Sequence, residues 1–404
     1  MRIAVIGAGV SGLSVARMLS DDYHVDIYEA ADSFGGIAKT EKISGATYHK
    51  IGGHCFNSKY QYVLDFVFSI YPRENWNSIE RKSQIHFKGH YVSYPIEFSM
   101  KEIFEIDPEL ACSMVEDMLS SGIDSPSNLA EWFISMFGET LAKEYFIPYN
   151  EKIWGKDPYR MSYEWVHDKL PTPNKRELVK SLLAEAKDDM PHARFFYPKS
   201  NDQYDFIRAL AEGLVVKLNT PVVSIGRCED GWLINGGMKY DRVISTIPMD
   251  VLPSLIDEAP SIVAEAASQL SFNKVTTMLW ESTPTDNTWT YYPSPETIFH
   301  RHIHIGNFFK PTKNVTITEA IGSVPEAEMI EQGSKFDHLL KPLAYNVSEH
   351  AYVVYDENYA QSKRVISEYL SEIGIHTLGR FGEWEYYNMD MCIKSALDLV
   401  DEHF

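Results

Sequence analysis

The sequence predicts an α/β fold in which a parallel-stranded domain is interrupted by a helical domain and by an antiparallel β-sheet domain. Three observations predict it. A glycine-rich turn joins an apolar run to a helical pattern near the N-terminus, helical sequence fills residues 99–189, and residues 190–375 contain many short apolar runs separated by loops. At 404 residues the chain exceeds the size at which a single core stops growing, so several domains are expected.

The first three elements predict the parallel sheet. Residues Arg2–Ile6 and His24–Tyr28 are short apolar runs, and residues Val10–Leu19 repeat apolar side chains at helical spacing between them. Because a strand, helix, strand order joins parallel strands through a right-handed crossover, we expect half of a doubly wound domain here.

After residue 82, the sequence predicts a hairpin, a long helix and further strands. Residues 83–94 alternate around Lys88-Gly89 as a hairpin does, and residues 129–146 predict one helix capped by Ser127. Strands are expected at residues 222–225 and 241–246.

Composition and charge exclude several classes of partner. A formal net charge of -20 disfavours nucleic acids and anionic membranes, which require a basic surface. No run reaches the roughly 20 apolar residues of a membrane span. Four dispersed cysteines form no CxxC pair, which argues against a zinc site or a disulfide framework and fits a reducing cytoplasm.

The glycine turn is typical of dinucleotide binding. Gly7 permits the tight turn, Gly9 admits a pyrophosphate to the backbone, and Gly12 lets the helix pack on the sheet. Glu29 ends the next strand, where a carboxylate suits ribose hydroxyls. The following pair Gly35-Gly36 favours FAD over NAD, because it lets backbone approach the flavin-side phosphate. The domain is therefore expected to be a Rossmann-like FAD-binding domain.

Six segments follow from this organisation. The expected FAD-binding domain comprises residues 1–82, 190–247 and 376–404. Residues 83–98 are expected to supply strands to the β-sheet domain, residues 99–189 to form the inserted helical domain, and residues 248–375 to form a mostly β-sheet substrate domain.

Further motifs resemble the UDP-galactopyranose mutase family, which lies within a flavoprotein superfamily that includes amine oxidases and phytoene desaturases. They occur in the family's order and span most of the chain, although the central region 248–348 matches poorly. The segments are KIGGHCF at residues 50–56, PYNEKIWG at 148–155, Arg301 between histidines, AYVVYD at 351–356, and GRFGEWEYYNM at 379–389.

The resemblance implies an FAD-dependent isomerase that interconverts pyranose and furanose forms of a nucleotide-linked sugar without net redox change, in cell-surface polysaccharide biosynthesis. It implies a reduced flavin whose N5 attacks the anomeric carbon. NAD(P)H or another reductant would reduce the flavin. The sugar, the base and the oligomeric state, including a homodimer, stay open.

The resemblance also assigns residues. Arg301 and Lys169 fall where the family places arginines against the diphosphate, with His54 and Gly53 beside the flavin. The expected catalytic residues are therefore Arg301, His54 and Lys169. The expected cofactor-binding residues are Gly7, Gly9, Gly12, Glu29, Gly35, Gly36, Gly53, His54, Val223 and Arg380. The expected substrate-binding residues are Tyr149, Trp154, Lys169, Arg301, Tyr352, Tyr386 and Asn388.

Three positions depart from the family pattern. Lys169 replaces an arginine and loses its bidentate fork, Asn388 replaces an aspartate, and Asn57 replaces a second histidine near the flavin. These departures leave open an FAD-dependent oxidoreductase of the amine oxidase or desaturase type, or a flavin-binding protein without catalysis. No metal is expected, and the histidines beside Arg301 are interpreted as strand residues.

Overall fold

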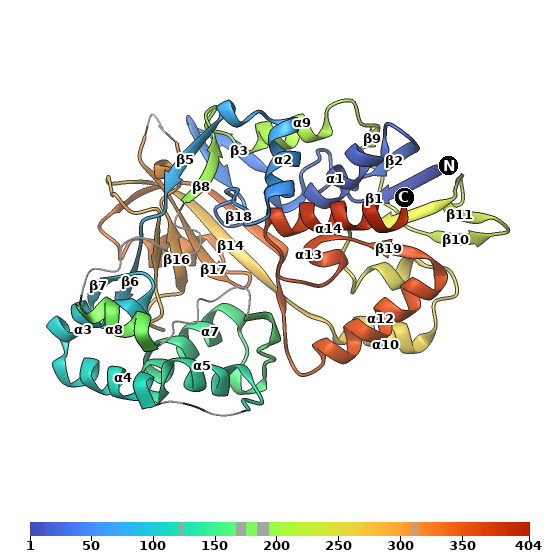
Figure 1. Cartoon of the computed structure of the whole chain (residues 1–404). Coiled ribbons are helices and arrows are strands. Elements are labelled where there is room, and N and C mark those ends of the chain that lie inside the picture. Colours follow the sequence, from blue (N-terminus) through green and yellow to red (C-terminus); the bar gives the residue numbers. More distant parts are fainter. Residues whose placement is uncertain (121, 123–124, 167–174, 184–193, 310–312) are drawn as a thin grey trace.

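The computed structural model describes residues 1–120, 122, 125–166, 175–183, 194–309 and 313–404. It confirms the predicted fold class. A parallel sheet, a large mixed sheet and a block of helices follow one another in space from one end of the molecule to the other (Figure 1). The helical block lies at the opposite end from both chain termini, with the large sheet between them. No helix among the described residues is both long and apolar enough to cross a bilayer.

The parallel sheet has five strands. Its order is β19 (Ile375–Thr377), β13 (Arg242–Ser245), β1 (Arg2–Ile6), β2 (His24–Tyr28) and β9 (Val216–Lys217), and every neighbouring pair is parallel. Helices α1 (Val10–Leu19) and α14 (Met389–His403) pack together against it (Figure 1). The last helix of the chain therefore packs on the first. The predicted strands Arg2–Ile6 and His24–Tyr28 and the predicted helix Val10–Leu19 are all present.

A small sheet of β10 (Ile225–Cys228), β11 (Gly231–Ile234) and β12 (Met238–Tyr240) lies against the parallel sheet. The strand expected at residues 222–225 instead begins at Ile225, because Val223 and Ser224 donate their backbone N–H groups to the Asn235 side chain rather than to a strand. The strand expected at 241–246 is present as β13.

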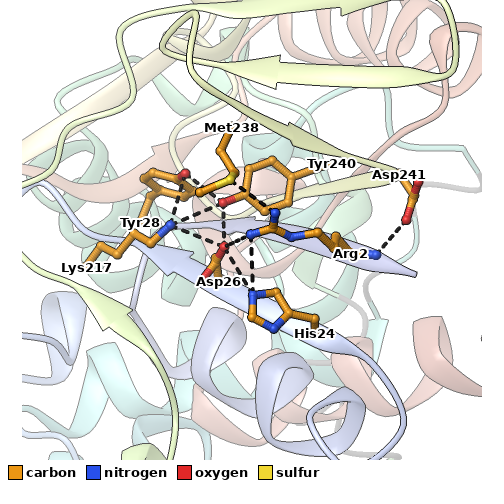
Figure 2. Close-up of polar contacts among 8 residues, drawn as sticks. All are labelled: Arg2, His24, Asp26, Tyr28, Lys217, Met238, Tyr240 and Asp241. Carbon is orange, nitrogen blue, oxygen red and sulfur yellow. Dashed lines mark hydrogen bonds and ion pairs between the residues drawn. The ribbon is translucent and has the colours of Figure 1, made fainter.

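A buried polar cluster joins the two sheets (Figure 2). The carboxylate of Asp26 on β2 accepts hydrogen bonds from Tyr240 at 2.6 Å and Arg2 at 3.2 Å, and it pairs with Lys217 at 3.2 Å. The hydroxyls of Tyr28 and Tyr240 lie 2.7 Å apart. Burial raises the pKa of Asp26, but the hydrogen bonds and the Lys217 charge outweigh burial and lower it below its usual value. The ionised carboxylate on β2 thus ties together four strands, β1, β2, β9 and β12.

The large sheet has seven strands in the order β18 (Leu339–Val354), β14 (Ser271–Ser282), β17 (Val315–Ile321), β16 (Phe299–Ile303), β15 (Trp289–Tyr291), β6 (Ser83–Phe87) and β7 (His90–Ser93). Only the β15–β6 pair is parallel. Strands β6 and β7 form the predicted hairpin, with Lys88 and Gly89 in the left-handed region.

The helical block contains α3 (Met100–Ile106), α4 (Pro108–Ser120), α5 (Leu129–Phe137), α6 (Glu139–Leu141), α7 (Ile147–Trp154) and α8 (Lys175–Leu183). The single helix expected over residues 129–146 is wrong. Gly138 has φ 81° and ends α5, and residues Ala142–Phe146 form a π-helical turn before α7. The cap is Asn128, whose side chain accepts from the Glu131 N–H, rather than Ser127.

The remaining elements connect these layers. They are β3 (Thr40–Ile43), β4 (Ala46–His49), α2 (Gln61–Ile70), β5 (Trp76–Glu80), β8 (Arg194–Pro198), α9 (Tyr204–Ala211), α10 (Ser261–Gln269), α11 (Glu326–Gly333), α12 (Tyr359–Ile373) and α13 (Gly379–Gly382).

Candidate active site

A cavity of ≈ 420 Å³ lies between the glycine turn and the large sheet, and we call it the central cavity. Predicted site residues from distant parts of the chain line it together. They are Gly7, Gly9, Glu29, Gly35, Gly36, Gly53, His54, Arg301, Tyr352, Arg380, Tyr386 and Asn388.

The glycine turn leaves its backbone open to this cavity. A Cβ atom on Gly12 would lie 2.0 Å from the Gly7 carbonyl oxygen, so only glycine lets α1 start this close to β1. Gly36 has φ 56°, and a Cβ there would lie 3.1 Å from the Gly9 Cα. The two glycine segments therefore approach each other with no side chain between them, as a phosphate-binding cradle requires.

Glu29 is fixed beside the cradle. Its two carboxylate oxygens accept from the backbone N–H groups of Ala8 and Ala31, each at 2.9 Å. Since each carboxylate oxygen has a second acceptor site, Glu29 can still accept from the hydroxyls of a ribose.

The opposite wall comes from the large sheet. Tyr291, Arg301 and Glu319 are aligned across β15, β16 and β17, with Tyr291 opposite Arg301 and Arg301 opposite Glu319. Directly opposite residues on paired strands share a face. Strand register therefore places three polar side chains in one row.

Glu319 holds this row together. Its Oε1 accepts from Arg301 Nε at 3.0 Å and from the Tyr352 hydroxyl at 2.9 Å, and it lies 2.9 Å from His300 Nε2. Its Oε2 accepts from the Gly52 N–H at 2.9 Å. The Tyr352 hydroxyl in turn accepts from Arg301 at 2.7 Å. Burial raises the pKa of Glu319, but Arg301 and His300 outweigh burial and hold it well below its usual range.

Sequence reasoning missed Glu319. The available signal was a single carboxylate in the buried run Val315–Ile321, where an unpaired charge would be costly. That signal indicates a partner but cannot name Arg301, because the pairing depends on strand register.

His54 faces the central cavity with a free ring nitrogen. Its Nε2 atom is buried and has no hydrogen-bond partner among the described residues. Burial and the nearby Arg380 charge lower the pKa of His54 to about 4, so the ring is neutral near pH 7. A buried nitrogen without a partner indicates a polar ligand atom at this place.

Arg380 is held rigidly at the third side of the cavity. Its Nε donates to the Tyr387 carbonyl at 2.8 Å and its NH1 to the Ala351 carbonyl at 3.1 Å. The guanidinium centre lies 5.0 Å from the centroid of the Tyr386 ring. Asn388 lies at the N-cap of α14.

Not every predicted site residue is found in the lining of the central cavity. Gly12 lies within α1, and Val223 is 66% exposed and does not line the central cavity. Tyr149 lies outside the lining and packs edge-on against Tyr291, at 6.1 Å between ring centroids. Trp154 lies behind the lining and contacts the rings of Tyr352 and Tyr386. Lys169 lies outside the described residues.

The histidines beside Arg301 make protein contacts. The His302 Nδ1 lies 3.1 Å from His338 Nε2, and His304 lies within 3.0 Å of the hydroxyls of Thr290 and Thr316. No group of three metal-ligating side chains occurs within the part of the chain that the structure describes.

Known proteins are similar to this chain in sequence over part or nearly all of its length. Residues 5–69 match the NAD(P)-binding Rossmann-like domain. The UDP-galactopyranose mutase of Mycoplasma genitalium is 22% identical over 98% of this chain and 94% of its own length. The dTDP-fucopyranose mutase of Escherichia coli is 24% identical over a shorter match, 39% of this chain and 42% of that protein.

Solved structures share the whole fold. A crystal structure of reduced UDP-galactopyranose mutase superposes with a TM-score of 0.86 at 24% identity, covering 99% of this chain and 95% of that one. A putative protoporphyrinogen oxidase from Exiguobacterium sp. 255-15 gives a TM-score of 0.76 at 17% identity, covering 99% and 98%. The chain is therefore similar over nearly its whole length to a UDP-galactopyranose mutase, and it shares the fold of that enzyme, including a Rossmann-like domain at residues 5–69.

Proposed function

We propose that the chain is an FAD-dependent mutase that interconverts the pyranose and furanose forms of a nucleotide-diphosphate sugar. One observation carries the proposal: the dinucleotide cradle and the Arg301, Tyr352 and Tyr386 group line the same cavity. An oxidase for apolar substrates has no need of such a cationic wall, whereas a diphosphate leaving group requires one. The full-length similarity to a UDP-galactopyranose mutase supports the same reaction class.

The residues present fit FAD. The side-chain-free approach of Gly9 and Gly36 suits the pyrophosphate, Glu29 suits the ribose, and the unpartnered His54 Nε2 suits a polar edge of the flavin ring. When bound and reduced, FAD supplies the nucleophile for the anomeric carbon. Arg380 would lie beside the flavin or its ribityl chain, held there by two backbone carbonyls.

Arg301 is positioned to bind the diphosphate. Glu319 and Tyr352 engage its Nε and NH2 atoms, and its NH1 atom makes no hydrogen bond within the described part of the chain. The pair with Glu319 fixes the guanidinium before substrate arrives, so little side-chain entropy is lost on binding. Tyr352 and Tyr386 would add hydroxyl contacts to the phosphates.

The other assigned residues remain part of the proposal. Tyr149 would stack with the base, and Trp154 would support Tyr352 and Tyr386 from behind. Lys169 and Asn388 would contact substrate, and Val223 would contact the cofactor.

The test measures binding and turnover of UDP- and dTDP-linked hexoses by chemically reduced protein, with product analysis of ring form. Activity should require reduction. Arg301→Ala should weaken UDP binding by about 1.5–3 kcal/mol, because a charged hydrogen bond is lost. The matched control is Arg160→Ala, which removes an exposed arginine paired with Glu357 and should leave binding unchanged. Failure of the reduced protein to bind or convert any of these sugars, with flavin bleaching by an amine or polyene, would instead favour the oxidoreductase alternative.

A further inference from the structure

Arg81 is a second arginine on the wall of the central cavity, and sequence reasoning gave it no role. It immediately follows β5, two residues before β6, and lines the cavity together with Trp289, Tyr291 and Arg301. Its NH2 donates to the Tyr291 hydroxyl at 2.5 Å, and its Nε donates to Ser83 Oγ at 3.1 Å. Because Tyr291 lies opposite Arg301 across β15 and β16, the contact places Arg81 next in the same polar row.

The charge of Arg81 is not balanced by a carboxylate. Among the described residues Arg81 forms no ion pair, whereas Arg301 lies 2.8 Å from the Glu319 carboxylate. Its guanidinium centre instead lies 4.8 Å from the centroid of the Trp289 ring and 5.3 Å from that of Tyr94. Ring faces attract a cation but do not neutralise it.

Three acidic groups near Arg81, namely Cys55, Tyr94 and Glu97, are mainly protonated near pH 7. Burial raises the pKa of the Cys55 thiol to about 12 and raises the pKa of Tyr94. Glu97, the carboxyl group that interacts with Tyr94, has its pKa raised by burial to about 8. A partly buried cation without an anion is unfavourable, so this wall favours a negatively charged ligand group.

Arg81 also has a free donor. Nε and NH2 are engaged, and NH1 makes no hydrogen bond within the described residues. Arg301 has the same pattern, with Nε and NH2 engaged and NH1 unengaged. Two fixed guanidinium groups on one cavity wall each retain a nitrogen for a ligand oxygen.

We infer that Arg81 binds an anionic group of the substrate, either the diphosphate or a carboxylate carried by the sugar ring. The inference rests on the proposed function and deepens it, because it adds a second arginine to the substrate site and makes sugar acids candidate substrates. Arg81 would also give the substrate site a second cation beside Arg301 whether or not Lys169 contacts the substrate.

Isothermal titration calorimetry with UDP, UDP-galactose and UDP-galacturonate distinguishes the two anionic groups that Arg81 could bind, the diphosphate and a sugar carboxylate. If Arg81 contacts the diphosphate, Arg81→Gln should weaken all three ligands by roughly 10- to 100-fold, and Arg81→Lys should recover part of the loss. If Arg81 contacts a sugar carboxylate, the unsubstituted protein should prefer UDP-galacturonate to UDP-galactose by about 10-fold or more. Arg81→Gln should then abolish that preference alone.

Two results would overturn the role of Arg81. Unchanged affinity for all three ligands in Arg81→Gln, while Arg301→Ala weakens UDP, would overturn the role of Arg81 and leave the proposed function intact. If the unsubstituted protein binds neither these three ligands nor dTDP-linked hexoses, the proposed function fails and Arg81 with it. Thermal melting checks that each variant is folded. Should Arg81→Gln not fold, Arg81→Met, which keeps an apolar stem but removes the charge, takes its place, and an unchanged affinity in that variant would equally overturn the inference.

Discussion

Glu319 shows how one buried carboxylate can organise a site from inside a sheet. Its side chain is fully buried, while its partner Arg301 is 19% exposed. Four groups converge on it: the Arg301 guanidinium, the Tyr352 hydroxyl, the His300 ring and the Gly52 N–H. The carboxylate therefore sets the orientation of the side chains that face the proposed substrate.

Replacing Glu319 with Gln should destabilise the protein by about 3–5 kcal/mol, because Arg301 is left without its buried partner. The pKa of Glu319 is lowered in the folded protein, so its contribution is present above its usual pKa and is lost as the pH falls below it. Urea denaturation at pH 7 measures the change in unfolding free energy. The control is Glu281→Gln, which breaks the exposed 3.2 Å pair with Lys313 and should cost no more than about 1 kcal/mol. Equal losses in the two variants would contradict the role of Glu319.

Among single residues of the site, the sequence predicted those that belong to local motifs. Gly7, Gly9, Glu29 and Gly36 were found because the turn, the helix start and the strand end are adjacent in the chain. Arg301 required the family resemblance. Glu319 and Arg81 were missed because they are brought to the site by strand pairing between β6, β15, β16 and β17, and no local spacing encodes that register.

The break between α5 and α7 shows how one glycine redirects an element toward the site. The residues from Leu129 onward carry apolar side chains at helical spacing, which is why one long helix was expected. Gly138 ends α5 with φ 81°, and Asp117 on α4 accepts from the N–H and hydroxyl of Thr140 to start the next turn. Periodicity predicted the helical content, whereas the break depends on the close approach of α4.

Gly138→Ala should therefore be strongly destabilising. An added Cβ would lie 2.6 Å from the Asp117 Cβ and 2.7 Å from its carbonyl carbon, in addition to the positive φ. We expect a loss above about 1 kcal/mol, measured by chemical denaturation. Gly89→Ala is the matched control: it has φ 83° but no heavy atom within 4 Å of the added Cβ, so it isolates the backbone cost. If the two substitutions cost the same, the contact with α4 contributes nothing.

Across the whole molecule, the parallel-sheet domain and the large sheet meet at one cavity, and each was predicted to a different extent. The parallel sheet follows from local apolar runs and the glycine turn. For the large sheet, local patterns predicted the β-strand content and the hairpin at residues 83–94 but not the strand order, because its strands come from residues 83–93 and 271–354 and pair across long stretches of chain. The cavity forms where α1, β16 and the segment around Arg380 converge, so its existence depends on the assembled fold.

The assembled fold also predicts acid sensitivity, because it holds several histidines neutral. Burial lowers the pKa of His49, His300 and His302, lowers that of His54 to about 4 and lowers that of His304 to about 3. Between those values and the ordinary pKa near 6.5, unfolding takes up a proton at each ring, so the unfolding free energy should fall as the pH falls below about 6.5. Each ring contributes up to about 1.4 kcal/mol per pH unit.

The buried acid Glu97 opposes this trend and provides the control. The pKa of Glu97 is raised to about 8, so its contribution to stability decreases as the pH rises from its usual value of 4.5 toward 8. Urea denaturation at pH 7, 6 and 5 should show a steep loss of unfolding free energy toward acid. In Glu97→Gln the loss should be steeper, by up to about 1.4 kcal/mol per pH unit, because the variant no longer releases the Glu97 proton on unfolding. A flat profile between pH 7 and 5 would mean that the buried rings are charged in the folded protein, which would contradict both the neutral His54 and the arrangement proposed around it.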